Sequence, residues 1–108
     1  MKRGDVVVVA ARGASSGKPR PAVVVQLDLF NETHASLTLC LITSELRNAP
    51  LFRIALEPSE RNGLNRASQV MVDKVFSATR ENIGRNIGEL DTADLRRVDE
   101  ALRLWLQL

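Results

Sequence analysis

Apolar runs and alternations along the chain predict a small protein built mainly from β-strands. Continuous apolar runs predict buried strands, and alternation of apolar with polar residues predicts strands with one buried face. The runs cover residues 5–10 and 21–26, and the alternating segments cover residues 35–43, 51–57 and 68–75. Small, polar and turn-forming residues between them predict a loop at 12–17, a connection at 27–33 and a turn at 58–65.

The C-terminal segment carries the helical pattern. Residues 91–106 predict one helix, with Asp91 as its N-cap and Asp94 in its first turn. Its expected apolar face consists of Leu95, Val98, Leu102, Trp105 and Leu106, which predicts Trp105 as a packed core residue. Residues 77–88 fit a single helical turn followed by a short strand.

Short strands closed by one terminal helix predict a mainly β fold with α (an α+β class). We expect a small, strongly bent antiparallel β-barrel with a C-terminal helix, in a single domain over residues 1–108. A barrel of this size does not enclose a deep ligand cavity. Its function is therefore expected on loops or in an outer groove.

The composition excludes several classes of site. Three Phe, one Trp and no Tyr argue against a base-stacking platform. One Cys and one His exclude a disulfide framework and a structural zinc site, so no metal or cofactor is expected. The chain has no segment typical of a signal peptide or a membrane span, which predicts a cytoplasmic protein without membrane contact.

The charges are unevenly distributed. Residues 1–88 contain 12 Lys and Arg against 8 Asp and Glu, a net charge of +4, whereas residues 89–108 contain 3 against 5, a net charge of −2. Arginine outnumbers lysine by 12 to 3. This bias suits phosphate binding, and a GC-rich genome produces the same bias without functional meaning.

Arg20 stands between two prolines at the start of an apolar strand. Pro19 and Pro21 fix their own φ, and Pro21 also keeps Arg20 in extended backbone. A preorganised cation of this kind suits phosphate recognition or stabilisation of transition-state charge. The alternative is a loop arginine in a surface salt bridge.

Two hydroxyl groups, those of Thr43 and Ser44, end the alternating strand at 35–43. They can simply cap a turn, or they can form a sparse site together with Arg20. No nucleophile elbow, phosphate-binding loop, dinucleotide fingerprint or paired histidines occur, and His34 is expected to be structural or exposed. A site with hydroxyls and one cation suits a substrate that brings its own nucleophile, as RNA does with its 2′-hydroxyl.

These residues lie in a series of short motifs that resembles the MazF/PemK family of toxin endoribonucleases along the whole chain. In order, the matching stretches are residues 3–9 (RGDVVVV), 18–25 (KPRPAVVV), 41–44 (LITS), 63–64 (GL), 68–70 (SQV), 73–75 (DKV), 87–90 (IGEL) and the helix through Val98, Ala101 and Leu102. The resemblance implies an SH3-like barrel that forms homodimers and cuts single-stranded RNA without a metal. The expected products are a 2′,3′-cyclic phosphate and a 5′-hydroxyl, and an acidic cognate antitoxin is expected to block the site.

The resemblance also implies roles for individual residues. Arg20 would stabilise the phosphate and take part in proton transfer, and Thr43 would orient the scissile phosphate. The residues that it implies in RNA binding are Arg12, Ser15, Lys18, Ser44 and Gln69, the last as either a structural or an RNA contact. Ser15 stands where many members of the family have a glutamate, so any role of that carboxylate is absent from this chain.

Two other functions are compatible with the same fold. One is a non-enzymatic toxin like CcdB, which inhibits DNA gyrase through an exposed helix end that bears a tryptophan; Trp105 invites that comparison. The other is a degenerate barrel that only binds RNA or protein, which the missing first-loop glutamate would favour.

Overall fold

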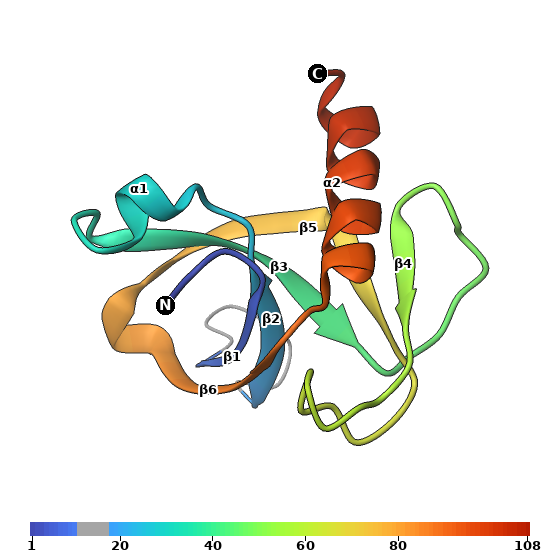
Figure 1. Cartoon of the computed structure of the whole chain (residues 1–108), viewed down its shortest axis with the longest axis horizontal. Coiled ribbons are helices and arrows are strands. Elements are labelled where there is room, and N and C mark those ends of the chain that lie inside the picture. Colours follow the sequence, from blue (N-terminus) through green and yellow to red (C-terminus); the bar gives the residue numbers. More distant parts are fainter. Residues whose placement is uncertain (11–17) are drawn as a thin grey trace.

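The computed structural model describes residues 1–10 and 18–108, and the regular structure of these residues is dominated by strands (Figure 1). In chain order the elements are β1 (Asp5–Ala10), β2 (Pro19–Val24), α1 (Asp28–Asn31), β3 (Ser36–Thr43), β4 (Arg53–Leu56), β5 (Ser68–Thr79), the 3-10 turn η1 (Arg80–Asn82), β6 (Ile83–Glu89) and α2 (Thr92–Leu106).

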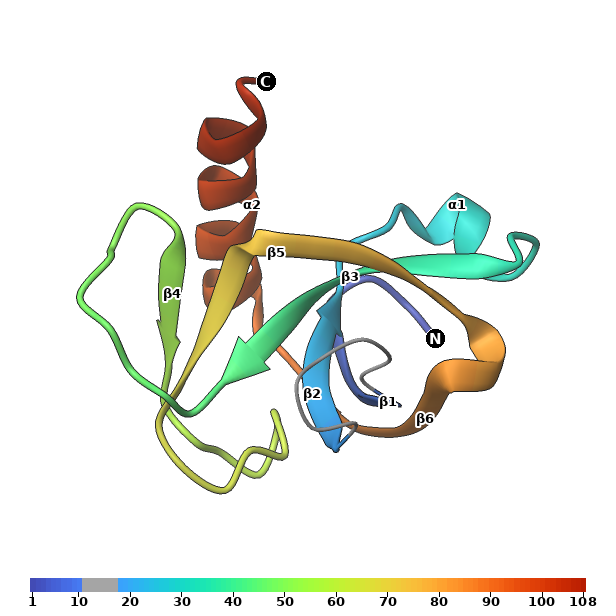
Figure 2. The same cartoon turned by 180° about the vertical axis from the view of Figure 1, so that it is seen from behind.

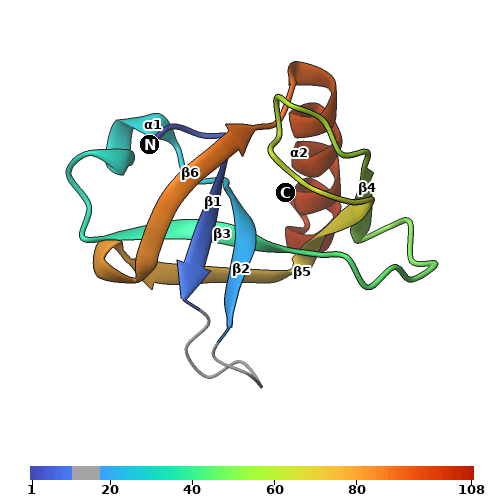
Figure 3. The ribbon, with the colours of Figure 1, turned by 90° about the horizontal axis from the view of Figure 1, so that it is seen from below.

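The strands form one antiparallel sheet in the order β4-β5-β3-β2-β1-β6. The sheet is strongly bent, so that β6, β1 and β2 cross over β3 and β5 (Figure 3). It is not closed, because β4 and β6 are its two edges in the described residues. The predicted fold class, mainly β with a C-terminal helix, is confirmed, and the predicted bent barrel is found as a strongly bent antiparallel sheet that stays open (Figure 2).

Both faces of the central strands are buried, each in its own hydrophobic cluster. Val6 and Val23 contribute to a cluster that α2 covers with Val98, Ala101 and Leu102. The alternate residues Val7, Val9, Ala22 and Val24 contribute to a second cluster with Leu37 and Leu39. Because successive side chains of a strand point to opposite faces, continuous valine runs are what a strand between two clusters requires.

Several predicted boundaries and faces are wrong. Strand β2 begins at Pro19 and ends at Val24; the prolines are tolerated because β3 pairs with β2 only over Ala22–Val24. Strand β5 continues to Thr79, four residues further than predicted. The alternation in 35–43 also predicts that Cys40 lies on the polar face of a half-buried strand. This is wrong, because Cys40 and Ile42, two residues further along β3, are buried in the α2-covered cluster.

The helical predictions have a mixed outcome. Asp91 caps α2 by accepting a hydrogen bond from the Asp94 N–H at 2.7 Å, as predicted. Residues 77–88 contain the expected helical turn and strand, η1 and β6. Trp105, however, is not a core residue: it is 51% exposed, and its ring stacks on Phe52 with centroids 5.7 Å apart. Within the described part of the chain, no helix has the length and apolar character needed to cross a membrane.

Candidate active site

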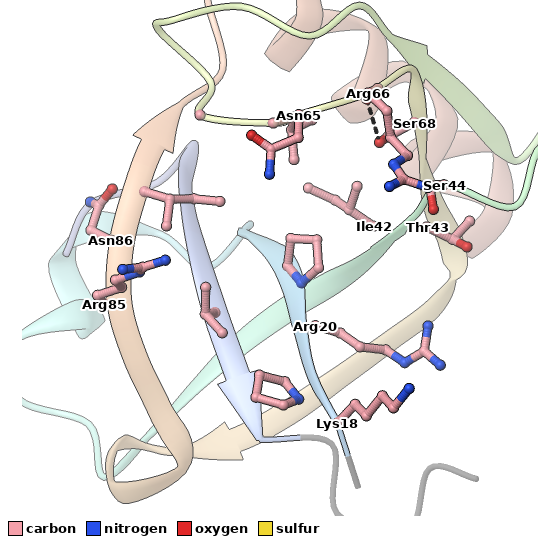
Figure 4. A pocket seen from close by; sticks show the side chains of 16 residues that line it. Lys18, Arg20, Ile42, Thr43, Ser44, Asn65, Arg66, Ser68, Arg85 and Asn86 are labelled. Atoms are coloured by element: carbon pink, nitrogen blue, oxygen red, sulfur yellow. Dashed lines mark hydrogen bonds between the residues drawn. The ribbon is translucent and has the colours of Figure 1, made fainter. Parts of the chain in front are cut away.

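A groove of about 710 Å³ opens on the surface where β1, β2, β3 and β6 meet the loop between β4 and β5 (Figure 4). Arg20, Thr43, Ser44 and Lys18, four of the residues singled out in the sequence, line this groove together. The volume exceeds what one phosphate requires and lies in the usual range for small-molecule and cofactor sites.

Neighbouring strands bring Arg20 and Thr43 to the same groove. β2 pairs with β3 over Ala22–Val24, and Arg20 precedes Ala22 by two residues. Thr43 follows Leu41, the partner of Ala22, by two residues, so Arg20 and Thr43 lie just beyond the same end of the paired segment. Arg20 also pairs with Val9 of β1, which fixes its main chain from the other side.

The Thr43 hydroxyl has a defined orientation. Its oxygen accepts a hydrogen bond from the Glu45 N–H at 3.0 Å. A hydroxyl can accept and donate at the same time, so the Thr43 O–H remains available as a donor to an anion in the groove. Ser44 follows as an exposed residue on the same rim.

The groove is lined by basic residues and by no acidic residue in the described chain. The basic residues are Lys18, Arg20, Arg66 and Arg85. No carboxylate of the described residues forms an ion pair with the guanidinium groups of Arg20, Arg66 or Arg85. A concave surface with charges of one sign concentrates counter-ions, so this groove attracts polyanions.

Gln69 lies outside the groove and holds a neighbouring loop. Its amide oxygen accepts hydrogen bonds from the Arg47 N–H and the Arg53 guanidinium, both at 3.1 Å. Its amide nitrogen donates to the Arg47 carbonyl at 2.8 Å. Gln69 thus fixes the segment that follows Thr43 and Ser44. Of the two roles predicted for Gln69, a structural contact and an RNA contact, these hydrogen bonds favour the structural one.

Two predicted RNA contacts, Arg12 and Ser15, lie outside the described residues. The sequence did not single out Asn65, Arg66 and Arg85, which also line the groove. Arg66 follows the predicted turn at 58–65, and Arg85 lies in the segment 77–88, which is predicted as a helical turn followed by a short strand. Their residue types fit a phosphate site, but the sequence gives no signal for the direction in which they point.

None of the described residues that line the groove is a His, Cys, Asp or Glu that could act as a base near neutral pH. His34 is exposed and lies elsewhere, where its carbonyl accepts a hydrogen bond from the Arg80 Nε at 2.9 Å. Burial raises the pKa of the Cys40 thiol to about 12, so it is no thiolate nucleophile. No group of three His, Cys, Asp or Glu side chains suited to a metal ion occurs in residues 1–10 and 18–108. The arrangement can bind a phosphodiester and stabilise additional negative charge on it.

Comparisons with known proteins agree on one family. Residues 2–106 match the model of the "PemK-like, MazF-like toxin of type II toxin-antitoxin system". The chain is 42% identical over 106 residues to the "Probable endoribonuclease MazF" of Mycolicibacterium smegmatis, covering 98% of this chain and 96% of that protein. It is 33% identical to "Endoribonuclease MazF9" of Mycobacterium tuberculosis, covering 100% and 98%.

Solved structures share the fold at lower identity. A mycobacterial endoribonuclease in complex with its cognate antitoxin has a TM-score of 0.84 at 23% identity, covering 100% of this chain and 96% of that chain. Toxin MazF-mt6 of Mycobacterium tuberculosis has a TM-score of 0.82 at 21% identity, covering 96% and 97%. MazF of Deinococcus radiodurans has a TM-score of 0.82 at 23% identity, covering 100% and 97%.

Proposed function

The chain belongs to the PemK-like, MazF-like toxin family of type II toxin–antitoxin systems, and from this premise we propose that it is an endoribonuclease that cuts single-stranded RNA in the basic groove. The relatives named as endoribonucleases support this activity over gyrase inhibition. The single observation that carries the proposal is that Arg20 and Thr43 line the same groove, just beyond the end of the paired β2–β3 segment.

The chemistry follows from what the groove supplies. The 2′-hydroxyl oxygen of the RNA attacks the adjacent phosphorus, and the bond from phosphorus to the 5′-oxygen of the next nucleotide breaks. The 2′-hydroxyl proton leaves to solvent and the departing 5′-oxygen takes a proton from solvent, which yields a 2′,3′-cyclic phosphate and a 5′-hydroxyl. Arg20 stabilises the charge that builds on the non-bridging oxygens, and the Thr43 O–H donates to one of them and holds the phosphate in line.

An RNA cleavage assay tests the proposal. Purified protein is incubated in EDTA with a pool of single-stranded RNAs, and the new ends are sequenced after 5′-phosphorylation. We expect 5′-hydroxyl ends at defined sequences, and no cleavage where a 2′-deoxynucleotide replaces the nucleotide that supplies the 2′-hydroxyl. Absence of cleavage across the pool, or cleavage of the 2′-deoxy substrate, would overturn the proposal.

We further propose a cognate antitoxin as the protein partner, since MazF and MazE of Deinococcus radiodurans are known as complexes. A basic groove without acidic lining residues suits an acidic segment of such a partner. We also propose that residues 1–108 form a single domain that works as a cytoplasmic homodimer without membrane contact. Exposed apolar side chains at the end of α2 support self-association.

A further inference from the structure

The groove extends beyond Arg20 and Thr43 to a second polar end. Arg85 on β6 and Asn65 on the loop between β4 and β5 line this end, and their side chains extend over the groove (Figure 4). Arg85 is exposed, and its guanidinium makes no hydrogen bond or ion pair with the described residues. Nothing in the proposed cleavage step uses either side chain.

Arg85 lies where β6 pairs irregularly with β1. β1 pairs with β6 at Val7↔Asn86 and at Val9↔Ile83, so two steps along β1 correspond to three along β6. This is a bulge opposite Val8, and bulges turn a side chain away from the direction that a regular strand would give it. Three consecutive residues, 85–87, line the groove at this irregularity.

An apolar floor separates the two polar ends. Val8, Pro21 and Ile87 are apolar lining residues of the groove, and Val8 lies on β1, between the strand that carries Arg20 and the strand that carries Arg85. A nucleoside presents apolar faces of its base and sugar between two charged phosphates. The order of cation, apolar floor and second cation therefore matches one nucleotide unit of an RNA strand with a phosphate at each end.

The rim that carries Asn65 is held rigidly in place. The buried Asn62 side chain accepts hydrogen bonds from the Ser59 and Leu64 N–H groups, both at 3.0 Å, and donates to the Glu57 carbonyl at 2.8 Å. The following residue, Gly63, has φ +70°, and a Cβ there would lie 2.0 Å from the Ile87 carbonyl oxygen. The loop is thus packed directly on β6, which fixes the position of Asn65 relative to Arg85.

We propose that Arg85 and Asn65 form a second nucleotide subsite, in which Arg85 binds a phosphate next to the scissile one and Asn65 contacts the nucleotide between them. The proposal rests on the proposed function, because it assigns the further contacts of the same RNA. It implies that the groove binds at least two phosphates of a single strand. The subsite contributes affinity, and the chemical step stays with Arg20 and Thr43.

Binding of a random-sequence 2′-O-methyl heptanucleotide pool tests the subsite independently of cleavage, since this RNA has no free 2′-hydroxyl. Its affinity is measured against salt concentration for the wild type, Arg85→Gln and the matched control Arg96→Gln. Arg96 is exposed on α2 and does not line the groove. For Arg85→Gln we expect about five- to tenfold weaker binding near 0.1 M salt and a slope of log K against log salt that is smaller by about 0.7.

Two further measurements separate the outcomes. With a cleavable RNA, Arg85→Gln raises KM by a similar factor and leaves kcat near the wild-type value, and Asn65→Ala changes the ranking of cleaved sequences. Equal affinities and slopes for Arg85→Gln and Arg96→Gln would overturn the subsite even if the wild type cleaves RNA. If the wild type cleaves no RNA but the slope changes as expected, the proposed activity fails and the phosphate subsite stands.

Discussion

Arg20 combines a fixed main chain with a guanidinium that makes no hydrogen bond or ion pair to the described residues. The flanking prolines limit the backbone on both sides, so few degrees of freedom are lost when the side chain binds an anion. We expect Arg20→Ala to lower kcat/KM for RNA cleavage by about 10²- to 10³-fold. Arg20→Lys should recover only a small part, because an ammonium cannot make the bidentate contact.

Single-turnover cleavage and thermal melting check this expectation, with Arg96→Ala as the control for a lost surface charge. Arg20→Ala should melt as the wild type does. If both arginine variants lose activity equally, Arg20 contributes only to the net charge and not to the site.

The Thr43 hydroxyl makes one local hydrogen bond and has its proton left to donate. Thr43→Val keeps the branched shape of the side chain but removes both the hydroxyl acceptor and the O–H donor. We expect the rate of cleavage to fall about ten- to a hundredfold, which is typical for the loss of a hydrogen bond to a charged group. Thr43→Ser should keep most of the activity. Thr33→Val, at an exposed position outside the groove, is the matched control in the same cleavage assay. Wild-type rates for Thr43→Val would exclude the hydroxyl from the reaction.

Cys40 is fully buried, and this burial is the main cause that raises its pKa to about 12. Because a thiol reacts as the thiolate, Cys40 should stay unmodified by iodoacetamide in the native protein at pH 8 and react once the protein is denatured. Mass spectrometry after timed exposure measures the difference. Stoichiometric labelling of the native protein within minutes would contradict the burial of this strand.

At the scale of single residues, the sequence alone singles out Arg20 and Thr43, which line the groove, and does not single out Arg85, which lines it too. Prolines around an arginine and hydroxyls at a strand end are local features that can be recognised without a structure. Arg85 lies in a bulge opposite Val8, and the bulge depends on how two strands pair whose residues at the bulge are 74 to 79 positions apart in the chain. Local patterns carry no information about such pairing.

Among the structural elements, the loop between β4 and β5 depends on one buried side chain, that of Asn62. Asn62→Ala would leave the Ser59 and Leu64 N–H groups and the Glu57 carbonyl without their partners. We expect a loss of about 2–3 kcal/mol in the free energy of unfolding. Urea denaturation measures it, and Asn48→Ala, at an exposed position, should change stability little. Similar stabilities for both variants would show that the loop does not depend on Asn62.

The strands and helix could largely be predicted because period-two alternation and a capped helical pattern are local. The errors occur where another element decides burial. Cys40 and Ile42 are buried because α2 and β4 cover the face expected to be polar. Trp105 lies on the apolar stripe of α2, but one turn beyond Leu102, a buried residue of the helix. Its side chain is therefore half exposed and stacks on Phe52.

For the whole molecule, the opposite charges of its two parts fall on different structural features. The basic excess of residues 1–88 includes the four cations of the groove, whereas three of the five acidic residues of 89–108 lie on α2, where Asp94 and Asp99 pair with Arg97 and Arg3. No acidic residue of the described chain lines the groove. An RNA strand or an acidic antitoxin segment would meet the same positive surface, so the two ligands should compete.

The single tryptophan, Trp105, lies at the exposed end of α2, so its fluorescence can report self-association through this surface. Leu104, Trp105, Leu106 and Leu108 are all more than half exposed, and Leu51 lines the same hollow as Leu104. A second copy of the chain that covers this surface would remove the single tryptophan from water. We therefore expect the fluorescence emission of Trp105 to shift to longer wavelengths on dilution, together with a fall in molar mass measured by sedimentation.

Leu104→Glu should produce both changes at high protein concentration, because a buried unpaired carboxylate opposes association. If the protein is a stable dimer but its Trp105 emission does not change on dilution and its molar mass does not change with Leu104→Glu, the dimer contact lies on a different surface.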